Sequence, residues 1–115
     1  MNESDLNPKK RPLMGLLMGT GYQDAVTMGE KTITIREGWR DYHTGDKVLI
    51  GCPEEGWCVM GKVTSVNFYT LGDVPIRDLN DDLFPTVEDA IDGLSRFYQN
   101  IDENTPVSVI RWILE

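Results

Sequence analysis

The sequence predicts a single α+β domain of 115 residues, built on a small curved β-sheet or barrel with helices beside it. We expect about five or six strands and two or three helices. Two observations predict this class. Alternating β-branched segments lie close together along the chain, while helical spacing occurs in only a few places. Strands and helices do not alternate regularly, which disfavours a doubly wound parallel sheet.

The first elements surround a short helix. Residues 12–18 are apolar enough for a buried strand. Residues 22–28 suit a helix that either Thr20 or Gly21 can cap. Gly29 stands where a helix commonly ends in a left-handed residue.

Residues 31–36 alternate strictly and are rich in β-branched side chains, which is the clearest strand signal in the chain. Because successive side chains of a strand point to opposite faces, Ile33 and Ile35 should face the core. Thr34 and Arg36 should share the other face. The polar and aromatic loop that follows has a length that often carries function.

A β-hairpin is predicted next, with a turn at residues 44–46 followed by strands over 47–51 and 57–68. Cys52 and Cys58 flank the connecting turn. Two cysteines do not form a disulfide framework, so we expect both to be small buried hydrophobes. Such thiols stay reduced in the cytosol, and we expect a cytoplasmic protein.

The C-terminal third begins with an irregular, acidic segment over residues 70–83. Thr86 is then the predicted N-cap of a helix, and Asp89 reaches back to it in a capping box. The buried face of this helix is expected to hold Ala90, Ile91, Leu94, Phe97 and Tyr98. Residues 107–114 form the predicted final strand, in which Trp112 rather than Arg111 faces inward.

Composition and charge limit the function classes. The formal net charge is −8, which argues against a general nucleic-acid clamp but permits a small nucleoside ligand. No apolar stretch reaches the roughly 20 residues needed to span a bilayer. One histidine and a C-x5-C pair do not supply a zinc set, so we expect no metal and no cofactor. We expect a disordered tail over residues 1–11 and one domain over 12–115, with no obligate protein partner.

The most informative segment for chemistry runs from Gly29 to Arg36. A regular strand would point Lys31 away from Thr34, so the two can converge only because Lys31 lies at the irregular start of the strand. Composition alone favours a solvated lysine there. Trp39 and Tyr42 follow in the loop, where a nucleobase could stack on their rings. The alternative for Trp39 is a hydrophobic side chain that closes the rim of the barrel.

These residues, Gly29, Lys31, Thr34 and Arg36, resemble the G-x-K-x-x-[TE]-x-R motif of ASCH domains, a branch of the PUA-like fold. The segment around them is similar to that of small bacterial ASCH enzymes that deacetylate N4-acetylcytidine. The resemblance covers about residues 20–113. It implies a PUA-like fold and an N4-acetylcytidine amidohydrolase activity that uses no metal.

The same resemblance implies the site residues. In the similar enzymes a lysine, a threonine and a glutamate are catalytic, and the first two correspond to Lys31 and Thr34. The position of the glutamate falls on Asp82, with Asp81 one step away as a second carboxylate near the substrate. Asp78 and Glu88 stay open as alternatives for this carboxylate.

Three functional hypotheses follow. In the first, Lys31, Thr34 and Asp82 hydrolyse the amide of an N4-acylated cytosine nucleoside, while Arg36, Trp39, Tyr42 and Asp81 bind the substrate. Thr34 would be either the nucleophile or the group that positions a water molecule. The second is a non-catalytic PUA-like module that binds RNA or a modified nucleobase. The third and weakest is an RNA-cleaving ASCH domain.

Overall fold

The computed structural model describes residues 11–115 and contains one five-stranded sheet. The predicted tail therefore lies outside the described residues, apart from Arg11. The strands lie in the order β1-β3-β4-β5-β2. Their bounds are Met14–Leu17 for β1, Lys47–Cys52 for β3, Trp57–Thr70 for β4, Pro106–Leu114 for β5 and Ile33–Glu37 for β2.

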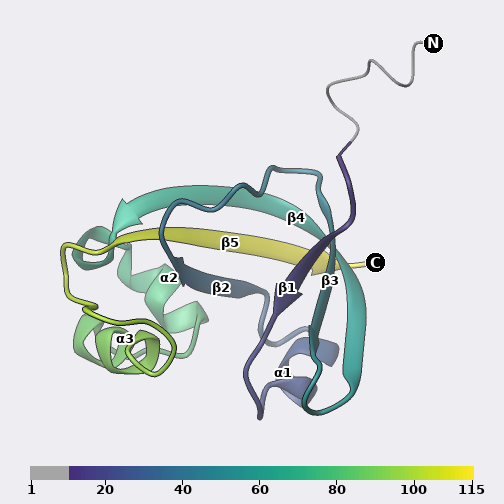
Figure 1. Cartoon of the computed structure of the whole chain (residues 1–115), viewed down its shortest axis with the longest axis horizontal. Coiled ribbons are helices and arrows are strands. Elements are labelled where there is room, and N and C mark those ends of the chain that lie inside the picture. Colours follow the sequence, from purple (N-terminus) through teal and green to yellow (C-terminus); the bar gives the residue numbers. More distant parts are fainter. Residues whose placement is uncertain (1–10) are drawn as a thin grey trace.

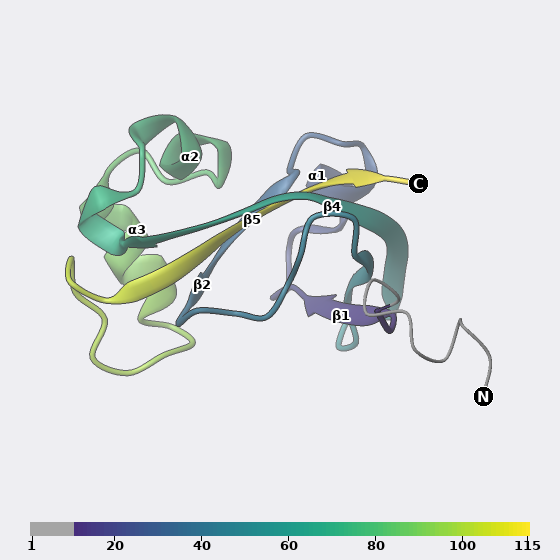
Figure 2. The same ribbon diagram turned by 90° about the horizontal axis from the view of Figure 1, so that it is seen from above.

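The sheet curls into a half-barrel (Figures 1 and 2). β1 pairs with β3 in parallel, and the other neighbours are antiparallel. The two long strands β4 and β5 arch across the molecule, and their register shifts between Val63 and Ser65. Such an irregularity increases the bend and twist of a strand. β1 and β2 are the two edge strands, so the half-barrel is open between them.

In residues 11–115 three α-helices flank the sheet, which confirms the predicted α+β class. They are α1 (Gln23–Thr27), α2 (Ile76–Asp81) and α3 (Val87–Leu94). A 3-10 turn, η2 (Leu71–Asp73), follows β4. Figure 1 shows α2 and α3 together at one end of the sheet, with α1 near β1 and β3 at the other.

The alternation of apolar residues produces two cores. One core lies inside the curl of the sheet and includes Leu16, Val48, Ile110 and Trp112. The second lies between the other face of the sheet and helices α2 and α3, and it includes Ile33, Ile35, Val107, Val109, Leu79 and Leu94. The inward positions predicted for Ile33, Ile35 and Trp112 are confirmed, because each is at most 3% exposed.

The segment expected to be irregular before residue 83 contains α2, so that expectation is wrong. This short helix has two apolar residues, of which Ile76 is exposed and only Leu79 is buried, so it carries little helical periodicity. Arg111 of β5 stabilises the helix from outside, since its guanidinium lies 2.6 Å from Asp78 and 2.8 Å from Asp81. These contacts link residues about 30 positions apart, which local sequence patterns do not report.

The helix expected after Pro85 begins as predicted but ends earlier. The backbone N–H of Asp89 donates to the Thr86 hydroxyl at 3.2 Å, which confirms the predicted N-cap. α3 ends at Leu94, and Phe97 is 66% exposed instead of continuing the buried face. The periodicity therefore extends one turn beyond the helix itself.

Two further expectations are corrected near the hairpin. Neither Thr20 nor Gly21 caps α1, because Tyr22 occupies the N-cap without a side-chain bond. Cys52 is buried as expected, but Cys58 is exposed. Cys52 pairs with Trp57 across the hairpin, so the two cysteines do not face each other.

The start of the described chain is held by polar contacts. The Arg11 side chain donates to Asp46 Oδ1 at 2.8 Å and to the Asp41 carbonyl oxygen at 2.9 Å. Asp46 also accepts from the His43 backbone N–H in the predicted turn. In residues 11–115, helices long and apolar enough to cross a membrane are absent.

The close approach of β3 and β4 generates a stability prediction. A Cβ on Gly51 would collide with the Trp57 carbonyl oxygen and lie 2.8 Å from Cys58 Cβ, whereas a Cβ on Gly15 meets nothing within 4 Å. We expect Gly51→Ala to lower the free energy of unfolding by more than about 2 kcal/mol, because strand backbone must move. Gly15→Ala is the matched control. Equal urea midpoints for the two variants would contradict the prediction.

Candidate functional site

The predicted motif folds as a link between α1 and β2. Gly29 has a φ of +77°, as expected for a residue that ends a helix. The backbone N–H groups of Glu30 and Lys31 both donate to the Ala25 carbonyl at 2.8 Å. β2 begins only at Ile33, so Lys31 lies in irregular chain before the strand. This irregular start lets its side chain turn toward the outer edge of β2.

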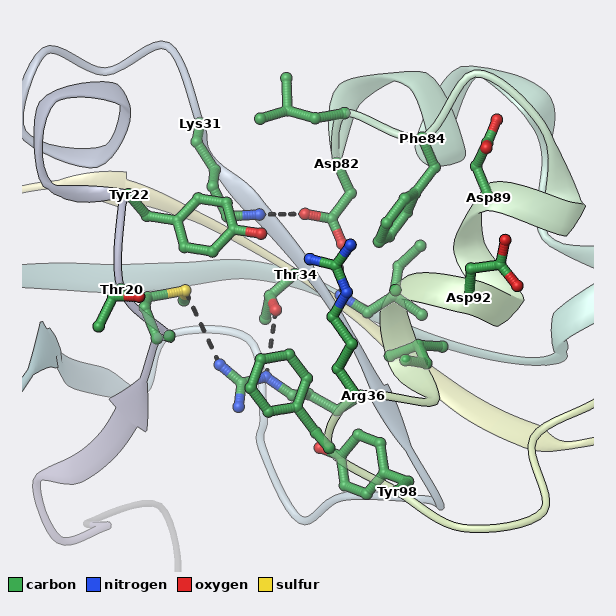
Figure 3. Close-up of a pocket in the computed structure, with 18 of the residues that line it drawn as sticks. Thr20, Tyr22, Lys31, Thr34, Arg36, Asp82, Phe84, Asp89, Asp92 and Tyr98 are labelled. Atoms are coloured by element: carbon green, nitrogen blue, oxygen red, sulfur yellow. Dashed lines mark hydrogen bonds and ion pairs between the residues drawn. The ribbon is translucent and has the colours of Figure 1, made fainter.

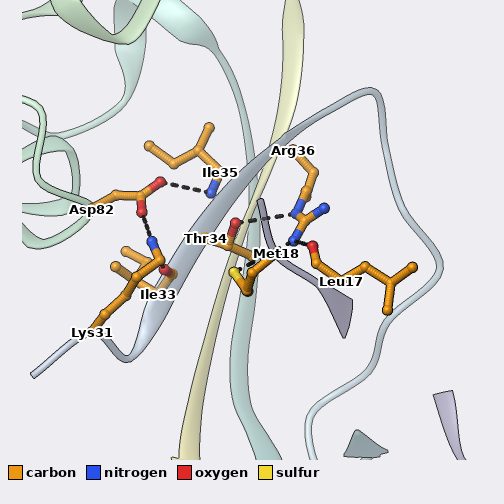
Figure 4. Close-up of polar contacts among 8 residues, drawn as sticks. All are labelled: Leu17, Met18, Lys31, Ile33, Thr34, Ile35, Arg36 and Asp82. Atoms are coloured by element: carbon orange, nitrogen blue, oxygen red, sulfur yellow. Dashed lines mark hydrogen bonds and ion pairs between the residues drawn. The ribbon is translucent and has the colours of Figure 1, made fainter. Parts of the chain in front are cut away.

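Lys31 is buried, with 3% of its surface exposed, which overturns the expectation of a solvated lysine drawn from composition. Its ammonium donates to the Ile33 carbonyl at 2.8 Å and forms a short ion pair with Asp82 Oδ1. The Tyr22 ring lies over it, with its centroid 5.2 Å from Nζ. Figure 4 shows the ammonium and the Asp82 carboxylate pointing toward one another.

Asp82 reaches this position from the end of α2. Its backbone N–H bonds to the carbonyls of Asp78 and Leu79, and the next residue, Leu83, has a φ of +69°. The chain thus reverses sharply and presents Asp82 to β2. Carboxylate oxygen Oδ2 accepts from the Ile35 backbone N–H at 3.0 Å.

The Lys31–Asp82 pair satisfies the open edge of β2. β2 has no neighbour on its outer side, and backbone groups on that side would otherwise lack partners. The Ile33 carbonyl bonds to Lys31 and the Ile35 N–H bonds to Asp82. The pair therefore occupies the positions that a sixth strand would take.

Burial raises the pKa of Asp82 above the ordinary range of an aspartate, because the carboxylate loses its hydration. The Lys31 ammonium and the Ile35 N–H oppose this rise by favouring the charged form. The Asp82 carboxylate and the Lys31 side chain are thus held against each other in a site that excludes most water.

Thr34 lies beside this pair, on the opposite face of β2 from Ile33 and Ile35. It is 6% exposed. Its Oγ1 accepts a hydrogen bond from Arg36 Nε at 3.1 Å. Lys31, Thr34, Arg36 and Asp82, all predicted from the sequence, line one cleft with a volume of about 870 Å³ (Figure 3).

The walls of the cleft come from segments that are distant in the sequence. The aromatic side chains lining it are Tyr22, Phe84, Phe97 and Tyr98. Its charged side chains, beyond the four residues above, are Glu54, Asp89, Asp92 and Arg96. The cleft therefore combines flat apolar surface with charges of both signs, a lining that suits a polar aromatic ligand.

Three predicted substrate contacts lie elsewhere. Trp39 is 73% exposed and packs on Phe68, with ring centroids 6.1 Å apart. The Tyr42 hydroxyl donates to the Gly15 carbonyl at 2.6 Å. Asp81 bonds to Arg111. None of the three lines the cleft.

Sequence reasoning missed the aromatic side chains that do line the cleft. Phe84 lies two residues after Asp82. Its closeness to the predicted catalytic carboxylate could therefore have identified it as a residue of the cleft. Phe97 was assigned to the buried face of α3, although it lies beyond the end of that helix. The Phe97 ring packs so near Gly19 that a Cβ added there would lie 3.2 Å from it, which joins segments 78 residues apart.

Comparison with solved structures identifies the architecture. The ASCH domain from Lactobacillus crispatus JV V101 matches 98% of this chain and 86% of its own, with a TM-score of 0.72 and 10% identity. This chain has an ASCH-type, PUA-like fold. The structure of the hypothetical protein PH0355 matches 89% of this chain and all of its own, with a TM-score of 0.65 and 17% identity.

The other comparisons give no match. No family model and no curated protein matches the sequence. At 10% and 17% identity, the structural similarity shows the fold and carries no information about the activity. Among residues 11–115, groups of three or more histidine, cysteine, aspartate or glutamate side chains placed to hold a metal ion are absent.

The buried ion pair generates a stability prediction. Asp82→Ala leaves the Lys31 ammonium buried without its counter-ion, so we expect the free energy of unfolding to fall by about 3–5 kcal/mol. The double variant Lys31→Met with Asp82→Leu removes both charges and should recover part of this loss. Glu30→Ala, which removes an exposed carboxylate, is the control. Urea unfolding at neutral pH measures all three, and a loss no greater than that of Glu30→Ala would refute the prediction.

Proposed function

We propose that this protein is an amidohydrolase that removes the acetyl group from N4-acetylcytidine or a related N4-acylated cytosine nucleoside. The observation that carries the proposal is the buried Lys31–Asp82 pair in the same cleft as the Thr34 hydroxyl. A base, a group that orients it and a hydroxyl nucleophile are the parts required for acyl transfer without a metal.

Lysine geometry supports a role in proton transfer. An ammonium has three N–H donors, and two of those of Lys31 bond to the Ile33 carbonyl and to Asp82. Among the described residues the third N–H has no protein acceptor, so it is available to a ligand in the cleft. In the proposed mechanism Lys31 acts as the base after it passes a proton to Asp82, to which it is hydrogen-bonded.

In the proposed reaction, Thr34 Oγ1 bonds to the acyl carbon while its proton passes to the Lys31 amine. The tetrahedral intermediate then loses the C–N4 bond, and Lys31 returns the proton to the leaving nitrogen. Water hydrolyses the acyl-threonine by the same steps in reverse order, which yields a carboxylate and regenerates the hydroxyl. Asp82 orients Lys31 throughout and touches no substrate atom.

The lining of the cleft supports a nucleoside as the ligand. Phe97 offers an exposed ring on the cleft wall, and a cytosine base can stack on such a ring. The carboxylates Glu54, Asp89 and Asp92 disfavour a polyanion, in keeping with the net charge of −8.

Substitution of the two reacting side chains tests the proposal. We expect wild-type protein to convert N4-acetylcytidine to cytidine and acetate, followed by the change in ultraviolet absorbance. Lys31→Ala and Thr34→Ala should each lower kcat by at least about a hundredfold, since each removes a group needed for proton transfer or bond formation. Lys62→Ala and Thr64→Ala, which alter exposed residues of the same types on β4, are the matched controls.

The outcomes separate the candidate functions. Full activity of both Lys31→Ala and Thr34→Ala would refute the catalytic roles proposed for these two residues. Absence of turnover by the wild-type protein would favour the alternative of a PUA-like binding module, which the exposed Arg96 and the aromatic walls of the cleft also suit. A titration with single-stranded RNA at low salt would then show saturable, salt-dependent binding.

A second prediction concerns the base-binding surface. If the cytosine stacks on Phe97, Phe97→Ala should raise KM about tenfold with little change in kcat, because a stacked base is worth about 1–3 kcal/mol. Trp39→Ala provides the comparison, since Trp39 lies outside the cleft. A KM that rises only in Trp39→Ala would instead assign the base to the loop after β2.

A further inference from the structure

We propose that Arg36 is a positioning residue that activates Thr34 by holding its hydroxyl oxygen as negative charge develops on it. The inference rests on the proposed function, in which Thr34 is the nucleophile. It assigns Arg36 to the protein's own hydroxyl, whereas the sequence suggested a contact with the substrate.

The position of the guanidinium is fixed from two sides. Its Nε donates to Thr34 Oγ1 at 3.1 Å. Its Nη2 donates to the Leu17 carbonyl oxygen and lies 3.8 Å from Met18 Sδ. Figure 4 shows the side chain reaching from β2 to the chain at the end of β1. Arg36 thus bridges the two edge strands across the open side of the half-barrel.

This bridge determines the direction of the Thr34 hydrogen bonds. A guanidinium has donors only, so Thr34 Oγ1 must be the acceptor of the bond from Arg36. The hydroxyl proton is then free to be donated to a base in the cleft. Because arginine stays charged at every working pH, its bond favours the alkoxide over the neutral hydroxyl.

Lys31 and Asp82, the other charged side chains of the proposed site, pair with each other. Within the described chain, Arg36 forms no ion pair with a carboxylate, although Arg11, Arg40, Arg77 and Arg111 each do. Asp82 senses the charge of Arg36 but is already paired with Lys31, so Arg36 bonds to Thr34 without a carboxylate in direct contact among residues 11–115.

A titratable probe at position 34 tests the inference without any substrate. Thr34→Cys places a thiol where the hydroxyl stands, and a thiol next to a fixed cation ionises at lower pH. We would introduce it with Cys58→Ser, which removes the exposed native thiol. Thiolate absorbance would be followed against pH, with Cys58→Ser alone as the blank for buried Cys52.

We expect the thiol to titrate about one pH unit or more lower with Arg36 present than with Arg36→Gln. Arg36→Lys, which keeps the charge but loses the planar fork, should give an intermediate midpoint. If Arg36→Gln does not fold, the comparison with Arg36→Lys supplies the test, because Lys31 and the burial of position 34 are the same in both backgrounds. Equal midpoints in either comparison would overturn the inference.

Steady-state kinetics of Arg36→Gln in the otherwise unchanged protein provide a second test of the inference. Arg36→Gln should lower kcat for N4-acetylcytidine by about tenfold or more while KM stays nearly constant. A raised KM at constant kcat would overturn the inference and assign Arg36 to substrate binding. Failure of the wild-type protein to turn over would refute the proposed function alone, because the thiol titration still reports on the contact between Arg36 and position 34.

Discussion

The outer edge of β2 is the constraint around which the cleft is organised. This strand ends the sheet, and its unpaired backbone groups must find partners inside the protein. Lys31 and Asp82 supply those partners and are consequently buried against each other. Burying two charges is costly unless they are paired and hydrogen-bonded, so each member of the pair holds the other in place.

The residues along β2 also connect this strand to helix α2 and to the opposite edge strand, β1. Asp82 lies at the end of α2, and α2 is held to β5 by the bonds between Arg111 and its two aspartates. On the other side, Arg36 reaches the chain at the end of β1. The half-barrel is open between β1 and β2, and the Arg36 side chain spans this open side. The cleft is the space that this arrangement leaves.

Much of the sheet follows from short-range patterns. The alternation in residues 31–36 and at the C-terminus specifies which side chains face inward, and Ile33, Ile35 and Trp112 occupy those positions. Capping chemistry specifies the start of α3 at Thr86. These features depend on neighbours within a few residues, and the burial of one face of a strand fixes its register.

The aromatic walls of the cleft depend on contacts between distant segments. Loop aromatic residues near the motif, Trp39 and Tyr42, were plausible from proximity in the sequence, but both pack elsewhere. Phe97 reaches the cleft because α3 ends at Leu94 and the chain then turns toward Gly19. Proximity along the chain is a poor guide to a site that closes between two edges of one sheet.

The sequence by itself determined the α+β class, the strand pattern and the motif residues Lys31, Thr34 and Arg36, because periodicity and spacing are local properties. The resemblance in that motif also pointed to Asp82. Only the tertiary structure decided that Lys31 is buried, that α2 exists and that Asp82 rather than Asp81 meets the lysine. The reason is physical: burial and ion pairing depend on which distant segment covers the unpaired edge of β2.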